Sequence, residues 1–241
     1  MLLELSGVSK RFGAIAAADG VNLSVAEGEA LGIIGANGAG KSSLFNLVTG
    51  VLRPDAGAIF FDGADITRTP VRQRCLAGIS RSFQVPQPFE SLTVFENLLV
   101  AVQFGRGAGH ADPVEFCAGI LGRTGLLAKA NAVAGELTLL DRKRLELARG
   151  LAGRPRILLL DEIAGGLTEA ECAELVALIG ALNAGGISIV WIEHVVHALI
   201  SVVSRLVVLE FGRKIAEGEP RAVMALPEVR RSYLGIEETL A

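Results

Sequence analysis

One eight-residue segment constrains the fold of this chain more than any other. From residue 35 to 42 it reads Gly-Ala-Asn-Gly-Ala-Gly-Lys-Ser, a complete match to the phosphate-loop pattern of spaced glycines followed by a lysine and a hydroxyl residue. An apolar run precedes it at 30–34, and apolar residues at helical spacing follow it. A strand, a glycine-rich loop and a helix in this order predict a P-loop core, and an ordinary glycine-rich turn is the weaker alternative.

The residue types of this loop have a physical reason. Glycines let successive backbone N–H groups turn inward onto phosphate oxygens, and the N-terminus of the following helix adds partial positive charge. Lys41 is expected to reach the β- and γ-phosphates, while the Ser42 hydroxyl is offered to Mg²⁺. The predicted nucleotide contacts of the loop are Asn37, Gly38, Ala39, Gly40, Lys41, Ser42 and Ser43.

A second acidic motif follows a buried apolar run at 157–160. A strand that ends in an acid would deliver Asp161 to the shell of the metal ion. Glu162 is the next residue, where its carboxylate can polarise an attacking water. An acid that only caps the next segment is the alternative, which the phosphate loop makes the weaker one.

The pattern of the whole chain predicts an α/β fold with a largely parallel central sheet. Short strands are expected at 2–5, 21–25, 30–34 and 58–61, buried strands at 157–160 and 187–192, and a hairpin from 206–209 and 213–216. Residues 70–135 are expected to be helical and irregular, with helices at 94–102 and 113–121 and a glycine-rich break at 105–109. Further helices are expected at 141–151 and 168–182, the second opened by a capping box of Thr168 and Glu171.

Composition excludes several classes of protein. The net charge of -3 and the absence of a long basic run argue against nucleic-acid binding. The cysteines Cys75, Cys117 and Cys172 are odd in number and far apart, so buried free thiols in a reducing compartment are expected. No signal peptide is visible, and the most apolar tract, 195–209, is broken by polar residues. A soluble chain is expected, with any membrane role reached through a partner.

The two motifs resemble those of the ABC ATPase family, and three further positions extend the resemblance over essentially the whole chain. Phe12 stands where the family places an aromatic ring that stacks on adenine, although a core phenylalanine is an alternative. Gln84 resembles the family's glutamine that contacts Mg²⁺ and water and leads to the membrane-domain contact. His194 follows a buried strand, as the family's switch histidine does.

This resemblance implies one ABC ATPase domain over residues 1–241. About 1–84 and 153–241 would form a RecA-like catalytic core with an antiparallel β subdomain near the N-terminus, and about 85–152 an inserted helical subdomain. The catalytic residues would be Glu162, His194 and Gln84. The metal contacts would be Ser42, Gln84 and Asp161, and the cofactors ATP and Mg²⁺.

The resemblance is closest to the ATP-binding subunits of branched-chain amino-acid importers. Three less specific pieces carry it: residues 81–97, residues 144–149 and the tail 227–235. An ATPase subunit of a lipid or other ABC exporter is the alternative. ABC proteins that act on DNA or ribosomes usually need more chain than 241 residues, and a P-loop kinase explains neither Gln84 nor His194.

The family's signature loop is altered here. Where Leu-Ser-Gly-Gly-Gln is usual, residues 137–141 read Leu-Thr-Leu-Leu-Asp, so Thr138 keeps a hydroxyl while two glycines are replaced. The resemblance implies that Thr138, Leu139, Leu140 and Asp141 face the ATP of a partner chain. Three features are expected to weaken that partner's site. They are the bulk of the leucines, their inability to adopt glycine-only backbone angles, and capping of the following helix by Asp141.

The resemblance also implies partners. We expect a second, different ATPase chain, with a homodimer as the alternative in isolation, two membrane permease subunits and a periplasmic or extracellular substrate-binding protein. The chain would lie peripherally on the cytoplasmic face of the inner (cell) membrane. The transported substrate is chosen by subunits outside this chain.

Overall fold

The computed structural model describes residues 1–105 and 112–234 of the chain, without the side chains of 232–234. Most of the expected glycine-rich break, 106–109, and Gly235 of the tail lie outside the described residues. Within those residues, no helix combines the length and the apolar character needed to cross a bilayer.

A six-stranded sheet lies at the centre of the molecule, in the order β10-β9-β3-β8-β7-β6. Its strands are β3 (Ala30–Ile34), β6 (Ile79–Arg81), β7 (Ile157–Asp161), β8 (Ser188–Ile192), β9 (Arg205–Glu210) and β10 (Arg213–Gly218). Every neighbouring pair is parallel except β10 with β9, which is the expected antiparallel hairpin. The predicted α/β class is therefore confirmed.

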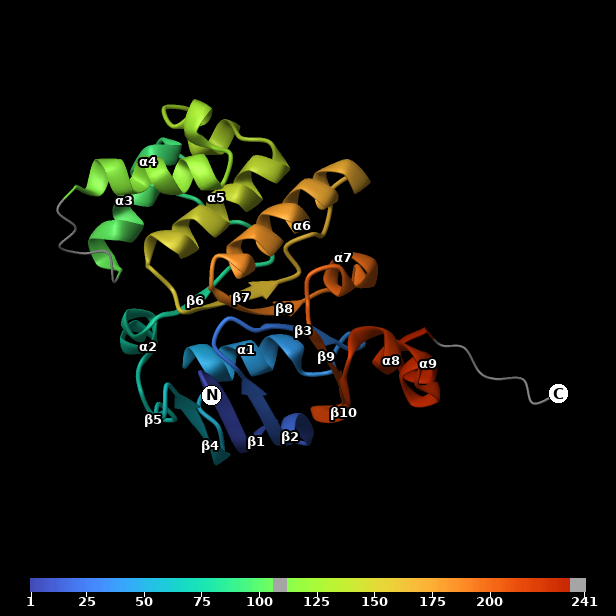
Figure 1. Cartoon of the computed structure of the whole chain (residues 1–241). Coiled ribbons are helices and arrows are strands. Elements are labelled where there is room, and N and C mark those ends of the chain that lie inside the picture. The colour runs from blue at the N-terminus through green and yellow to red at the C-terminus, as the bar shows by residue number, and fades with distance from the viewer. Residues whose placement is uncertain (106–111, 235–241) are drawn as a thin grey trace.

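The central strands are buried on both faces. In β7, Leu158 and Leu160 pack into one hydrophobic cluster, whereas Ile157 and Leu159 pack into the other. Successive side chains of a strand point to opposite faces, so a continuous apolar run is stable only when both faces are covered. Figure 1 shows the two covering layers.

One layer is helix α1 (Lys41–Thr49) together with an antiparallel sheet. That sheet has the order β2-β1-β4-β5, formed by β1 (Leu3–Phe12), β2 (Ile15–Val25), β4 (Ala56–Phe61) and β5 (Ala64–Asp65). Helix α1 ends at Gly50, whose φ of 83° is readily adopted only by glycine. The carbonyls of Leu47 and Val48 accept bonds from the buried guanidinium of Arg74.

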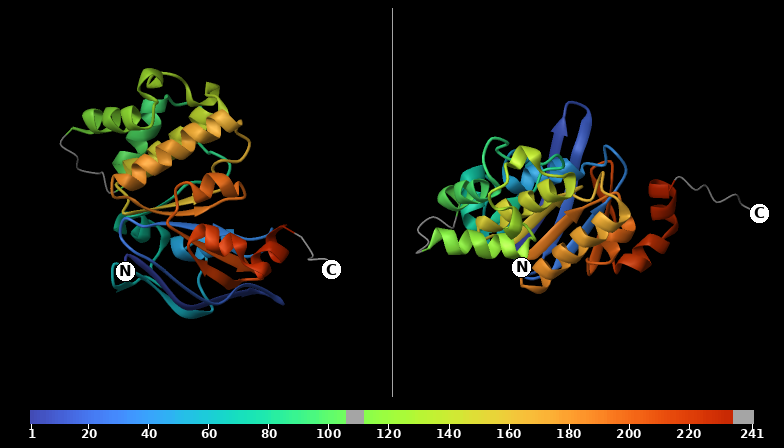
Figure 2. Two further views of the ribbon diagram at one scale, coloured as in Figure 1. Left: turned by 45° about the vertical axis from the view of Figure 1, so that its right-hand side comes forward. Right: turned by 90° about the horizontal axis from the view of Figure 1, so that it is seen from above.

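The other layer is helical. It contains α3 (Val94–Phe104), α4 (Pro113–Arg123), α5 (Leu139–Ala152) and α6 (Glu169–Ala184), with 3₁₀ turns at Leu127–Lys129 and Ala134–Glu136. Figure 2 shows these helices gathered above the sheet. The N-terminus of α6 has the predicted capping box, since the Thr168 hydroxyl accepts from the Glu171 N–H. The division at 85 and 152 into a core and a helical subdomain remains a prediction.

Several elements differ from the expectations. Strands β1 and β2 are longer than residues 2–5 and 21–25, and the stretch expected to be helical and irregular contains the strand β6 after the short helix α2 (Val71–Ala77). Helices α7 (Val196–Ile200), α8 (Pro220–Ala225) and α9 (Pro227–Leu234) complete the described chain. Cys117 and Cys172 are buried as expected, but Cys75 of α2 is exposed, because it lines a groove at the surface.

Candidate nucleotide site

The predicted site residues meet at one edge of the central sheet. Strand β3 ends at the phosphate loop, β6 shortly before Gln84, β7 at Asp161, and β8 shortly before His194. Carboxyl ends of parallel strands share an edge, and this edge is where open α/β sheets bind ligands. Residues that are far apart in the sequence are therefore neighbours in the structure.

The phosphate loop is closely packed against the rest of the chain. A Cβ atom at Gly40, whose φ is 100°, would lie 2.2 Å from the carbonyl oxygen of Ala17. The Lys41 Nζ donates to the Gly35 carbonyl at 2.7 Å and to the Ala36 carbonyl at 3.2 Å. The lysine thus bridges the start of the loop in which it lies, and α1 begins at this residue.

Lys41 is 5% exposed, and its charge is sensitive to two acids. Burial lowers the pKa of its ammonium, while the carboxylates of Glu162 and Asp161 oppose that change. An ammonium held inside a loop of backbone amides at a helix N-terminus forms a site for a polyanion.

A cavity of about 280 Å³ lies over the loop. It is lined by Phe12, Ile15, Ala17, residues 37–43 and Glu162, a set that includes every predicted nucleotide contact. The Phe12 ring is 49% exposed, so its placement does not fit a core phenylalanine. Ile15 and Ala17 were not predicted, although an isoleucine shortly after Phe12 in a β-hairpin is a signal that could have suggested the first.

Glu162 lies at the centre of a polar cluster. Its carboxylate accepts from the Gln84 Nε2 at 2.5 Å, and its other oxygen lies 2.8 Å from the His194 Nε2. The backbone of Glu162 has a φ of 47°, a left-handed conformation that is uncommon for a residue with a side chain. The three predicted catalytic residues are therefore in direct contact.

Asp161 is 4% exposed and has a partner that the sequence did not suggest. The Arg81 guanidinium donates to its carboxylate at 2.7 Å and to the Asn46 side chain at 2.5 Å. The Asp161 N–H also donates to the Ser82 hydroxyl, at 3.3 Å. Arg81 ends the unpredicted strand β6, which explains why its role was missed.

The oxygen donors of Ser42, Asp161 and Gln84 suit Mg²⁺ chemically, since this ion prefers hard oxygen ligands. Within residues 1–105 and 112–234, no three His, Cys, Asp or Glu side chains group as a protein-only metal cage.

The altered signature loop differs from the expectation in two ways. Thr138, not Asp141, caps α5, because its hydroxyl accepts from the Asp141 N–H at 3.3 Å. The Asp141 carboxylate is instead held by Lys129, by Arg144 at 3.6 Å and by the Thr138 hydroxyl at 3.0 Å. Leu139 and Leu140 are ordinary helical residues, so the loop needs no glycine-only backbone angle.

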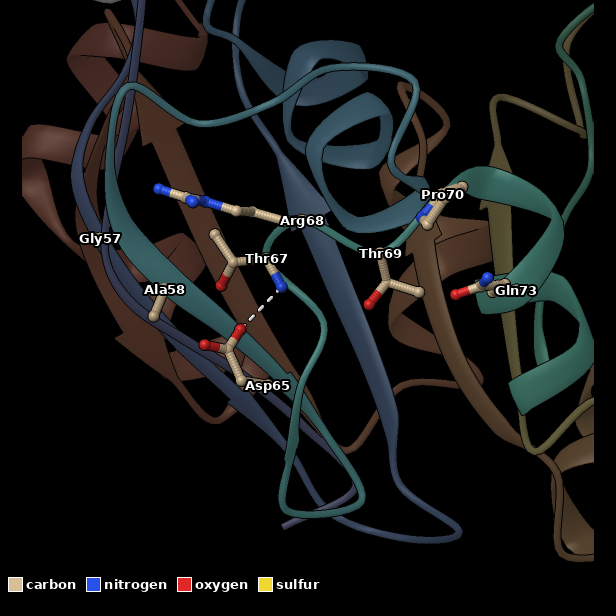
Figure 3. Close-up of a pocket in the computed structure, with 8 residues that line it drawn as sticks. All are labelled: Gly57, Ala58, Asp65, Thr67, Arg68, Thr69, Pro70 and Gln73. Carbon is tan, nitrogen blue, oxygen red and sulfur yellow. Dashed lines mark hydrogen bonds between the residues drawn. The ribbon is translucent and has the colours of Figure 1, made fainter.

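A second hollow lies beside the antiparallel sheet (Figure 3). It is lined by Gly57, Ala58, Asp65, Thr67, Arg68, Thr69, Pro70 and Gln73. The Asp65 carboxylate already accepts the Thr67 N–H at 2.8 Å. The predicted nucleotide contacts all line the cavity over the phosphate loop, which is therefore the candidate functional site.

The fold and the cavity define a P-loop nucleotide-binding cassette, and comparisons with known proteins extend this result. Residues 18–165 match the family model described as ABC transporter. A high-affinity branched-chain amino acid transport ATP-binding protein, BraF of Pseudomonas aeruginosa, is 37% identical over 97% of this chain and 98% of its own.

Solved structures agree. An ABC transporter cassette in its ADP conformation has a TM-score of 0.88 at 32% identity, over 98% of this chain and 99% of its own. A dimeric cassette bound to ADP and Pi has a TM-score of 0.79 at 26% identity, over 91% of this chain and 99% of its own. The chain belongs to the ABC transporter family, and it is an ATP-binding, ATP-hydrolysing cassette of that family.

Proposed function

We propose that this chain powers the uptake of branched-chain amino acids or related small molecules through separate membrane subunits. The likeness to BraF over nearly the full length of both chains supports this substrate class. The observation that carries the ATPase chemistry is the contact of Gln84 and His194 with Glu162 beside the phosphate loop.

Nucleotide binding is assigned to the cavity residues. Phe12 offers a half-exposed ring to the base, and the N–H groups of residues 37–43 face the phosphates. Lys41 supplies the point charge for the β- and γ-phosphates. Mg²⁺, held through Ser42, Asp161 and Gln84, would neutralise charge that develops on the phosphates.

Glu162 is assigned as the group that takes a proton from the attacking water. Gln84 and His194 each contact one of its oxygens, so they fix the direction of the carboxylate. Gln84 follows strand β6 and His194 follows strand β8, whereas Glu162 follows β7. A shift of the segment at Gln84 would therefore misplace the base.

The contact with the membrane subunits is assigned to the segment around Gln84. Phe83, Val85 and Phe89 are 48%, 69% and 47% exposed, an unusual density of large apolar side chains on one short stretch. Phe83 also lines a groove of about 260 Å³ with residues of α2 and β6. A helix of a permease buried there would be mechanically linked to Glu162.

The remaining partners follow the importer assignment. They are two permease subunits, a periplasmic or extracellular substrate-binding protein and a second, different ATPase chain, with a homodimer as the alternative in isolation. The dimeric relative supports the pairing of cassettes. The chain would lie on the cytoplasmic face of the cell membrane.

The decisive experiment is Glu162→Gln in the complex with the permease subunits. The amide keeps the shape of the side chain but cannot act as a base, so Mg·ATP binding should persist while hydrolysis falls roughly 100-fold or more. His194→Ala should slow turnover at nearly unchanged affinity. Glu169→Gln, an exposed change at the start of α6, is the matched control.

Hydrolysis at the wild-type rate in Glu162→Gln would remove this residue from the mechanism. The direction of transport is tested separately in proteoliposomes. Uptake of branched-chain amino acids that depends on ATP and on the binding protein supports the importer. Outward movement of lipid without such uptake favours the exporter alternative.

A further inference from the structure

A buried carboxylate lies next to the predicted catalytic residues Glu162 and His194. Glu193 is 1% exposed and stands between β8 and His194. Its Oε1 accepts from the Ala164 N–H at 2.7 Å and from the Trp191 indole N–H at 3.2 Å. Its Oε2 accepts from the His194 N–H at 3.2 Å. One side chain therefore joins the loop after Glu162 to the backbone of His194.

These contacts suit an ionised Glu193, because each partner donates and a carboxylate only accepts. Burial raises the pKa of Glu193, and the four N–H donors, including that of Val195, oppose the change. Lys143 of α5 is 2% exposed, and the charge of Glu193 opposes the lowering of its pKa by burial.

The backbone of Glu162 needs such a restraint. Its left-handed conformation is strained for a residue with a side chain, and it persists only when neighbouring contacts enforce it. The Glu162 N–H donates to the Ile192 carbonyl at 2.8 Å, which holds one side of the residue. The bond from the Ala164 N–H to Glu193 holds the other side, two residues further on.

We propose that Glu193 is a positioning residue that fixes Glu162 and His194 relative to each other. This inference rests on the proposed catalytic role of Glu162. Glu193 lies outside the nucleotide cavity, so it acts on the direction of the catalytic carboxylate and not on ATP affinity.

The first test is Glu193→Gln in the assembled complex. The amide replaces one carboxylate oxygen by an NH₂ group, which donates and cannot accept. This NH₂ group would face either the His194 N–H or the N–H groups of Ala164 and Trp191, so hydrogen bonds are lost in both cases. We expect kcat to fall roughly 10- to 100-fold, as a misplaced catalytic group requires, with KM for ATP changed less than about twofold. Glu169→Gln is the matched control and should leave both constants unchanged.

The second test uses a signal that does not depend on activity. Trp191 is the single tryptophan of the chain, it is buried, and its indole N–H bonds to Glu193. In the full-length chain alone, Glu193→Gln should change the tryptophan emission spectrum, whereas Glu169→Gln should not. Binding of Mg·ATP should remain measurable in both variants.

Glu193→Asp is the second variant, because it keeps a carboxylate that only accepts hydrogen bonds but shortens the side chain. It should lower kcat less than Glu193→Gln does, with KM unchanged. Wild-type kcat in both variants would overturn the proposal, as would a loss confined to KM. If Glu162→Gln also hydrolyses ATP normally, the catalytic assignment itself has failed; if it alone is inactive, only the positioning role has failed.

Discussion

At the scale of single residues, charges of opposite sign lie beside the phosphate loop. Lys41 is influenced by Glu162 and Asp161, and Asp161 is paired with Arg81. Each charge is buried together with a partner, because an isolated buried charge is strongly unfavourable. A nucleotide with its metal ion would therefore enter a site in which positive and negative side chains already neutralise each other. Each charge can be tested separately.

Lys41→Ala should abolish productive binding of Mg·ATP, because the loop loses the point charge that faces the β- and γ-phosphates. Its bonds to the Gly35 and Ala36 carbonyls would also be lost, so the loop itself would loosen. Equilibrium binding of a fluorescent ATP analogue measures the effect. Arg221→Ala, an exposed change on helix α8, serves as the control. Unchanged affinity in Lys41→Ala would contradict the assignment of the loop.

Arg81→Met should destabilise the fold, because Asp161 would be left buried without its counter-charge. Breaking a buried ion pair on one side typically costs roughly 3 kcal/mol or more. Urea denaturation of the nucleotide-free chain measures this loss. Lys10→Met breaks the more exposed pair with Asp55 and should cost much less. Equal losses in the two variants would mean that Arg81 contributes no more than a surface charge.

At the scale of elements, the sequence predicted those strands and helices whose pattern is complete within a short window. Strand β3, the phosphate loop and α1 follow one another as expected, and the two central strands β7 and β8 were visible as continuous apolar runs. Strand β6 has three residues, too few to show a period, and it was missed. Strand β1 was shortened because its register shifts after Leu5, near Gly7 with its φ of 59°, and interrupts the alternation.

The same limit applies to the site. Site residues that belong to a short sequence motif, such as Lys41 and Glu162, could be predicted. Arg81 and Glu193 could not, because their importance depends on contacts with residues that are distant in the sequence. Asp141 shows the opposite error. Its position near the start of a helix predicted a cap, but its carboxylate is paired with Lys129 and Arg144 instead.

The start of α5 permits a prediction about an element. Thr138→Ala removes the hydroxyl that accepts the Asp141 N–H, and loss of such a cap costs about 1 kcal/mol. Urea denaturation should detect a loss of this size. Thr138→Ser keeps the hydroxyl and is the control. If the alanine and serine variants are equally stable, the cap contributes nothing and the start of α5 is held by its ion pairs.

At the scale of the whole molecule, the proposed pairing of cassettes makes the altered signature loop important. In such a pair, residues 138–141 of this chain would face the ATP held by its partner. The structure reduces the number of ways in which these residues could weaken the partner's site. Backbone strain and a competing Asp141 cap no longer apply, since the leucines are helical and the carboxylate is paired. The bulk of Leu139 remains, because its side chain is 42% exposed at the helix N-terminus.

We therefore expect a heteromeric complex to hydrolyse ATP mainly at the phosphate loop of this chain. Removing the corresponding lysine of the partner should leave most of the turnover, whereas Lys41→Ala should remove most of it. Leu139→Gly should raise turnover at the partner's site, because it exposes the N–H groups of the helix N-terminus to phosphate. Leu140 is left unchanged in this test, since it is 7% exposed and belongs to the core. Steady-state ATPase rates of the three complexes decide the matter: equal losses from the two lysine changes, together with no gain from the glycine, would refute the asymmetry.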